Sequence, residues 1–222
     1  MKNVFYWSIV AALAGLLFGF DTVVISGADK KLQNLWESSD GFHGTVVMGM
    51  ALWGTVVGAL FGSFPTQRLG RKTTLFWIGV LYTISAVGSA LSNDPIVFAV
   101  FRFIGGLGVG ISTIAAPAYI SEIAPPKDRG RLVGLYQFNL VFGILLAFLS
   151  NYLLSDIGDN AWRWMMGVEA FPAILFTLLC LTIPKSPRWL ITRGLVDEAK
   201  AIYAKVDPNG SFDQLLQEIN QS

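Results

Sequence analysis

Six long apolar runs, separated by short charged connections, determine what this chain can fold into. They cover residues 4–27, 44–66, 73–92, 95–120, 131–154 and 163–184. In a bilayer the backbone must satisfy its own hydrogen bonds, and a helix of roughly 20 apolar residues spans the hydrocarbon core. Only 14% of the residues are charged, whereas about a quarter are charged in soluble domains. The pattern predicts an all-α membrane protein with six transmembrane helices.

The distribution of lysine and arginine predicts how the chain is oriented. With a cytoplasmic amino terminus, twelve of the 16 basic residues fall in inner segments and three in outer ones, while Arg102 lies within a span. The inner residues are Lys2, Arg68, Arg71, Lys72, Lys127, Arg129, Arg131, Lys185, Arg188, Arg193, Lys200 and Lys205, and the outer ones are Lys30, Lys31 and Arg163. Basic residues concentrate on the cytoplasmic side of membrane proteins. We therefore expect a multi-pass protein of the cytoplasmic membrane with both termini inside.

The last 38 residues, 185–222, have a different pattern from the six-helix transmembrane domain predicted for residues 1–184. Ser186 followed by Pro187 is typical of a helix start. Two amphipathic stripes follow, formed by Leu195, Ala199, Ile202 and Val206 and then by Phe212, Leu215, Leu216 and Ile219. Such helices are too short and too polar to span a bilayer. We expect them to form a cytoplasmic helical linker beneath the bundle.

Glycines recur at four-residue spacing in three of the apolar runs. The sets are Gly15 and Gly19, then Gly54, Gly58 and Gly62, then Gly106 and Gly110. Small residues at this spacing let helix backbones approach closely in lipid. The Gly106–Gly110 segment superficially resembles a nucleotide loop, but no strand precedes it. The glycines therefore predict a compact helix bundle.

Three ionisable side chains, Asp21, Arg102 and Glu169, lie inside predicted spans. For Glu169, a few residues after Trp162-Arg163-Trp164, the alternative is a side chain that reaches the outer membrane interface. Three unpaired charges would cost about 8–10 kcal/mol on an insertion scale, so they must pair, bind a proton or face water. Arg102 can neutralise one carboxylate, and the other can then bind a proton, because removal from water disfavours its charged form. This arrangement favours proton coupling. The alternative is a static ion pair that fixes helix register.

Polar and aromatic residues suggest where a small hydroxylated substrate would bind. Gln137 and Asn139 lie in the fifth run, and amide side chains both donate to and accept from sugar hydroxyls. Phe18, one helical turn before Asp21, offers an apolar surface for a sugar ring. The alternative is that the amides join helices to one another. Spacing alone leaves both interpretations open.

Other classes of function find little support in the sequence. The net charge of +1 gives no indication of nucleic-acid binding. The single cysteine, Cys180, excludes a disulfide within the chain and is best explained as a buried apolar residue. We find no nucleophile–base pair, metal cluster or phosphate loop, so we expect neither an enzyme nor a cofactor beyond protons as coupling ions.

Several motifs resemble those of the sugar porter family of the major facilitator superfamily, in matching order and spacing. They are Gly19-Phe-Asp21-Thr-Val-Val-Ile-Ser-Gly27, Arg68-Leu-Gly-Arg-Lys72, Arg102-Phe-Ile-Gly-Gly106, Tyr119-Ile-Ser-Glu-Ile-Ala-Pro125 with Arg129-Gly-Arg131, Trp162-Arg-Trp164 with Gly167-Val-Glu169, and Pro184-Lys-Ser-Pro-Arg-Trp-Leu190. The likeness covers nearly the whole chain and extends to the bacterial xylose and glucose proton symporters. It implies the amino-terminal half of such a transporter, with a 3+3 inverted repeat.

The resemblance also implies roles for individual residues. Asp21 matches the aspartate of proton symporters, where passive facilitators have asparagine, and Arg102 and Glu169 match its partners. Gln137 and Phe18 match sugar contacts. A cytoplasmic charge network that latches one state is implied for Arg68, Arg71, Glu122, Arg129, Arg131 and Arg188. Three positions depart from the family pattern, namely Ser63, Gln67 and Lys185, and we expect a weakened or rewired latch.

Together these features predict proton-coupled import of a monosaccharide by alternating access, with this chain as the amino-terminal half. Family members have twelve spans, so we expect a fragment that needs a missing carboxy-terminal half, although pairing with another chain is the alternative. A passive facilitator is the nearest competing function, and Asp21 argues against it. A non-transporting sugar sensor would need a long signalling tail, which the sequence does not supply.

Overall fold

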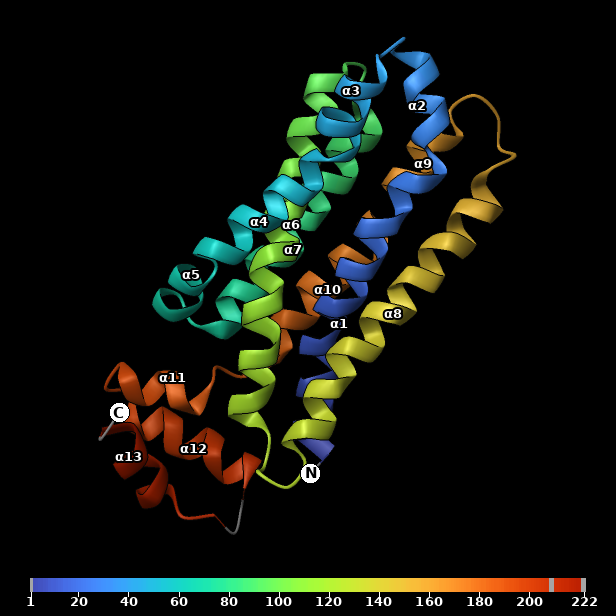
Figure 1. Cartoon of the computed structure of the whole chain (residues 1–222). Helices are drawn as coiled ribbons and strands as arrows, with labels where there is room; N and C mark the ends of the chain where they lie inside the picture. The colour runs from blue at the N-terminus through green and yellow to red at the C-terminus, as the bar shows by residue number, and fades with distance from the viewer. Residues whose placement is uncertain (1, 208–209, 221–222) are drawn as a thin grey trace.

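The computed structural model describes residues 2–207 and 210–220, and these residues form helices without any strand. The elements are α1 (Lys2–Val24), η1 (Ile25–Gly27), α2 (Asp29–Leu35), α3 (Asp40–Phe42), η2 (His43–Met48), α4 (Met50–Phe61), α5 (Ser63–Arg68), α6 (Arg71–Leu91), α7 (Pro95–Ile123), α8 (Arg129–Leu154), α9 (Ala161–Gly167), α10 (Ala170–Thr182), α11 (Pro187–Thr192), α12 (Val196–Val206) and α13 (Phe212–Asn220). The long helices run side by side in an elongated bundle (Figure 1).

Six stretches of the described chain are long and apolar enough to cross a membrane. They are Asn3–Gly27, Asp40–Phe61, Arg71–Leu91, Pro95–Ile123, Arg129–Leu154 and Ala161–Thr182. The prediction of six spans in an all-α membrane protein is confirmed. Both ends of the chain lie at one end of the bundle, and α2 and α3 lie at the other (Figure 1). We call these the termini end and the α2–α3 end.

Two of the spans are interrupted, which the apolar pattern did not predict. The second predicted run, residues 44–66, is interrupted at Gly49, before α4, and at Gly62, between α4 and α5, and the sixth is interrupted at residues 168–169, between α9 and α10. The breaks at Gly62 and at residues 168–169 each lie three or four residues before a proline, Pro65 or Pro172. Proline has no N–H to donate to the carbonyl four residues earlier, and its ring clashes with that carbonyl. The prolines thus explain these two breaks.

Close helix pairs are formed at the glycines that the sequence singled out. On α4 and α7, a Cβ added to Gly106 would overlap the carbonyl oxygen of Ala51, and one on Gly54 would overlap that of Phe103. On α1 and α8, Gly19 lies equally close to the carbonyl of Leu140. These pairs are the second span with the fourth and the first with the fifth. In a bundle of two three-helix repeats, the first span corresponds to the fourth and the second to the fifth. The contact between the second and fourth spans then corresponds to the contact between the fifth and first, as is observed.

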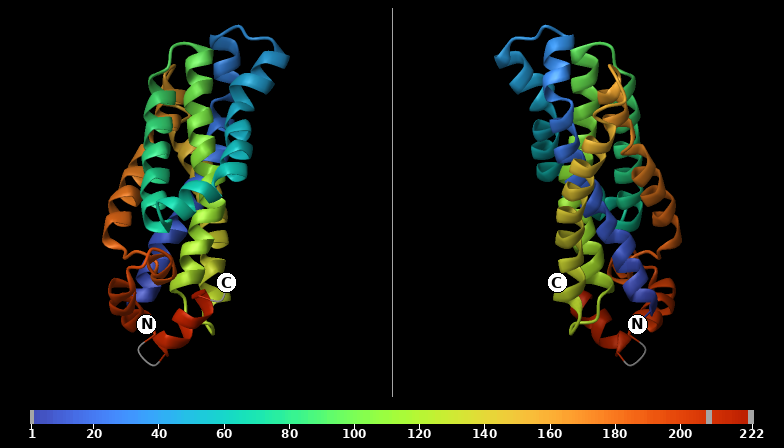
Figure 2. Two further views of the ribbon diagram at one scale, coloured as in Figure 1. Left: turned by 90° about the vertical axis from the view of Figure 1, so that its left-hand side faces the viewer. Right: turned by 90° about the vertical axis from the view of Figure 1, so that its right-hand side faces the viewer.

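A small apolar cluster of its own joins the three helices that follow the last span. Leu190 and Ile191 of α11, Ala199 of α12 and Leu215 of α13 are its buried members. The predicted cap is present, since the Ser186 side chain accepts a hydrogen bond from the backbone N–H of Trp189. Figure 2 shows these helices gathered at the termini end, below the long helices.

We predict that Gly106→Ala lowers the free energy of unfolding by about 1–3 kcal/mol, because the added methyl group forces α4 and α7 apart. Thermal unfolding of the purified chain in detergent measures the change. Gly134→Ala is the matched control, since among the described residues no heavy atom beyond the neighbouring backbone of its own helix lies within 4 Å of a Cβ at that position. Equal stability of the two variants would show that the close packing does not hold the helices together.

Candidate functional site

An ion pair between α1 and α7 occupies the interior of the bundle. Arg102 Nη1 donates to Asp21 Oδ1 at 2.5 Å, and Nη2 donates to Asp21 Oδ2 at 3.3 Å. Nη2 also donates to the backbone carbonyl of Asp21 at 2.9 Å. Only 1% of Asp21 and 2% of Arg102 is exposed. Two-pronged contact of this kind is the strong form of a charge-assisted hydrogen bond.

The third predicted charge, Glu169, lies in the same cluster. It is 1% exposed and its carboxyl interacts electrostatically with both Asp21 and Arg102. Within the described residues, Glu169 Oε1 and Arg102 Nε have no hydrogen-bond partner. The break between α9 and α10 places Glu169 at an interrupted helix turn. The structure therefore places a second buried carboxyl group beside the Asp21–Arg102 pair, and among the described residues Glu169 forms no ion pair of its own with Arg102.

The charged cluster separates two apolar cores. One core, toward the termini end, includes Leu17 and Phe176, and the other, toward the α2–α3 end, includes Phe98 and Met166. Asp21, Arg102 and Glu169 thus lie on three different spans, each near the boundary between the two cores. On the α2–α3 side the rings of Trp36, Phe98 and Trp162 pack together, with centroids 5.4–6.3 Å apart.

The predicted sugar contacts lie on the closely paired helices α1 and α8. Phe18 of α1 is half-buried beside the core toward the termini end, and Gln137 of α8 is exposed. Asn139 donates from its amide to the carbonyl of Leu135 in its own helix at 2.9 Å. The neighbouring Tyr136 is buried, with its hydroxyl 3.2 Å from that of Ser112. Of the two predicted amides, Gln137 is therefore the more accessible one.

Only one pair of the predicted latch residues makes contact. Arg71 Nε donates to Glu122 Oε1 at 3.0 Å, and its Nη2 lies 2.8 Å from the same oxygen. Arg188 instead lies 3.5 Å from Glu218 of α13. The Arg68 guanidinium sits over the Phe64 ring. Of the others, Arg131 is exposed and Arg129 is half-buried, with its Nε unpaired among the described residues.

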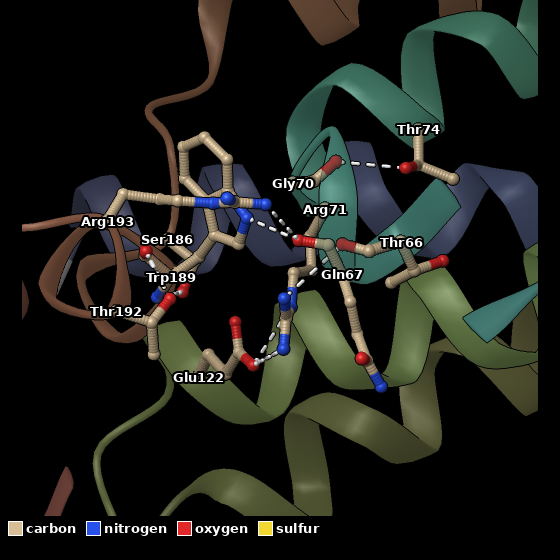
Figure 3. Close-up of polar contacts among 10 residues, drawn as sticks. All are labelled: Thr66, Gln67, Gly70, Arg71, Thr74, Glu122, Ser186, Trp189, Thr192 and Arg193. Carbon is tan, nitrogen blue, oxygen red and sulfur yellow. Dashed lines mark hydrogen bonds and ion pairs between the residues drawn. The ribbon is translucent and has the colours of Figure 1, made fainter. Parts of the chain in front are cut away.

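A contact that the sequence did not reveal joins α11 to the last turn of α5 and to the connection that follows it (Figure 3). Trp189 Nε1 donates to the carbonyl of Gln67 at 2.8 Å, and Arg193 Nη2 donates to the carbonyl of Arg68 at 2.9 Å. The indole ring covers Gly70, whose φ of 86° suits glycine. Both acceptors are backbone groups, which no side-chain pattern could have indicated.

Breaking the central ion pair should destabilise the chain more than removing it whole. Asp21→Asn or Arg102→Leu alone each leaves a buried group unpaired, and we expect each to cost about 3–5 kcal/mol. The double variant should lower the free energy of unfolding by clearly less than the sum of the two single losses, as measured by unfolding in detergent. Lys185 and Glu198 are the control pair, about 43% and 44% exposed, and should couple by less than about 1 kcal/mol. Additive effects at Asp21 and Arg102 would contradict the pairing.

Trp189→Ala should release α11–α13 from the bundle without unfolding it. The variant loses both the hydrogen bond to Gln67 and the ring that covers Gly70. We expect amide exchange in α11–α13 to become about tenfold faster, as a loss of about 1.4 kcal/mol gives, while the six spans keep their protection. Thr192→Ala, which removes an exposed hydroxyl of the same helix, serves as control. Unchanged exchange in α11 would show that the indole does not fasten it.

Comparison with known proteins identifies the family. The family described as "Sugar (and other) transporter" matches residues 7–222. The chain is 38% identical to the D-xylose-proton symporter of Escherichia coli strain K12, over 99% of this chain and 51% of that protein. It is 40% identical to the glucose transport protein of Synechocystis sp., over 99% and 49%, and 37% identical to the arabinose-proton symporter of Bacillus subtilis, over 97% and 47%.

The solved structures agree. The major facilitator superfamily proton:xylose symporter XylE bound to 6-bromo-6-deoxy-D-glucose superposes with a TM-score of 0.92 at 35% identity, over 99% of this chain and 53% of that one. The partially occluded inward-open form of XylE gives 0.90 over 99% and 59%. The chain thus spans about half the length of the relatives it matches. It belongs to the Sugar (and other) transporter family, whose fold here is that of the major facilitator superfamily.

Proposed function

We propose that this chain forms the amino-terminal half of a transporter that imports a monosaccharide together with a proton by alternating access. Residues 1–184 form its transmembrane domain and residues 185–222 its cytoplasmic helical linker. The termini end faces the cytoplasm and the α2–α3 end faces outward, across the cytoplasmic membrane. The excess of lysine and arginine at the termini end supports this orientation.

The observation that carries the proposal is a second buried carboxyl group, that of Glu169, beside the buried Asp21–Arg102 ion pair. Arg102 is engaged with Asp21, and Glu169 lies beside both. Arg102 can neutralise one carboxylate at a time, so the other is stable in the interior as the neutral acid. When Arg102 changes partner, the proton changes place, and a change of helix packing can accompany it. Asp21 binds the proton that permits sugar-loaded closure and releases it toward the cytoplasm.

A monosaccharide is the substrate that the site and the relatives support. Gln137 offers an accessible amide for sugar hydroxyls, and Phe18 offers an aromatic surface one turn from Asp21. The matched proteins carry names that refer to xylose, arabinose, glucose and inositol, all small polyhydroxylated rings. The second half of the transporter would complete the site, since transporter sites lie between repeats.

The inner ion pair has a separate part in the proposed cycle. Arg71 and Glu122 join α6 to α7 at the cytoplasmic end. Pairs at this rim stabilise the outward-facing arrangement, and their separation accompanies opening to the cytoplasm. Arg68, Arg129 and Arg131 stand near the same end and are free to meet groups of the second half. Passive facilitation remains the competing function, and it requires the Asp21–Arg102 pair to be static.

Replacing Asp21 by Asn in a full-length transporter that contains these 222 residues should abolish uphill uptake while leaving sugar exchange intact. The amide cannot cycle a proton, whereas exchange requires no net proton movement. Accumulation of labelled xylose in vesicles, with and without a pH gradient, measures the effect. Asp159→Asn is the control, because Asp159 is exposed. Gradient-driven accumulation that survives in the Asp21 variant would refute the coupling role.

A further inference from the structure

The charged cluster is buried by this half of the transporter alone. Asp21 and Glu169 are each 1% exposed and Arg102 is 2% exposed, although nothing covers the face where a second half would lie. A second half can add cover but cannot expose these groups. Protons that reach Asp21 or Glu169 must therefore travel inside this bundle.

One face of α6 presents buried hydroxyls that have no partner among the described residues. Tyr82, Ser85 and Ser89 are at most 1% exposed, and none of their side-chain oxygens has a hydrogen bond in the described part of the chain. Their spacing of three and four residues places them on the same side of the helix. Buried hydroxyls in folded proteins are almost always paired with protein or with ordered water. These oxygens are therefore suited to hold water.

Three other hydroxyls in or next to α6 behave differently. Thr74 and Thr83 of α6, and Ser92 directly after it, each donate to the backbone carbonyl four residues earlier, at 2.7–2.9 Å. This is the ordinary way in which serine and threonine are satisfied within a membrane helix. Ser85 and Ser89 do not use it, so their oxygens remain available to other donors and acceptors.

The face leads from the charged cluster toward the outer end of α6. A Cβ built on Gly105 would touch Ser85 Oγ and would lie 3.3 Å from Asp21 Oδ1, so the hydroxyl and the carboxylate meet at the same point of α7. From Ser85 the face continues through Ser89 to Ser92, a rise of about 10 Å. Asn93 follows, and it is exposed.

We propose that this hydroxyl face, formed by Tyr82, Ser85 and Ser89, carries protons through hydrogen-bonded water between the outer surface and the Asp21–Glu169 carboxyls. Each hydroxyl accepts one proton and donates another, so it relays charge without keeping any, and the proton that enters ends on a carboxylate. The titratable and charged groups around it are Asp21 from α1, Arg102 from α7, Glu169 from the α9–α10 break, Tyr82 itself, Tyr136 from α8 and, at the outer end, Arg163 of α9, which donates to the carbonyls of Ala90 and Ser92. The inference rests on the proposed proton coupling and specifies its route.

The test follows protonation of the carboxyls after a rapid pH change, in the 222-residue chain held in lipid nanodiscs. Time-resolved infrared absorption reports the neutral carboxyl, and Asp21→Asn and Glu169→Gln assign the signal. We expect Ser85→Ala/Ser89→Ala to slow protonation at least tenfold with the final amplitude unchanged. Ser89→Ala alone should slow it less, and Ser89→Thr, which keeps the hydroxyl, should restore the rate.

Ser8→Ala is the matched control, because Ser8 is equally buried and its hydroxyl also lacks a partner among the described residues. It lies 13 residues before Asp21 in α1, about 20 Å along the helix, and its removal should not alter the rate. Wild-type rates in the double serine variant would overturn the route while leaving proton coupling intact. A wild-type chain without any signal assigned to Asp21 or Glu169 would instead refute the coupling itself. If the double variant does not fold, the comparison of Ser89→Ala with Ser89→Thr carries the test.

Discussion

A guanidinium group inside the membrane is the constraint to which the rest of this structure responds. Arg102 cannot lose its charge in a protein, and an uncompensated charge at the centre of a span costs about 2.5–3.5 kcal/mol or more. Asp21 supplies both carboxylate oxygens and its backbone carbonyl to the same side chain. Contact this close requires α1 and α7 to approach at Gly105, where any side chain would meet the carboxylate.

The Asp21–Arg102 ion pair lies between two closely packed helix pairs. Glycine contacts hold α1 against α8 and α4 against α7, and backbone packing of that kind resists deformation. The Asp21–Arg102 ion pair joins α1 of the α1–α8 helix pair to α7 of the α4–α7 helix pair. In the proposed cycle Glu169, at the break of the sixth span, competes with Asp21 for Arg102. A proton that moved between the two carboxyls would act where the α1–α8 and α4–α7 pairs meet, and a change of partner there can alter their mutual orientation.

Sequence reasoning recovered the features that depend on composition and spacing. The six spans follow from the length of the apolar runs, and the glycine contacts of α4 with α7 follow from four-residue spacing. The breaks at Gly62 and at residues 168–169 were missed, although Pro65 and Pro172 gave a signal. The burial of Glu169 could not be inferred, because its nearness to the outer end of the span left a position at the membrane surface open. The attachment of α11 could not be predicted from the sequence, since Trp189 and Arg193 donate their hydrogen bonds to backbone carbonyls.

The same backbone acceptors explain how this half tolerates its departures from the family pattern. Trp189 binds the carbonyl of Gln67, a contact that any residue at position 67 can make, while the exposed Gln67 amide points away from the indole (Figure 3). Lys185 lies 3.4 Å from Glu198 of α12, so its positive charge has a partner outside the Arg71–Glu122 pair. The contact of Trp189 is thus independent of the residue at position 67, and Lys185 adds a contact between the end of the sixth span and α12. In the proposed full-length transporter, the effect of these two departures should therefore fall on contacts with the second half.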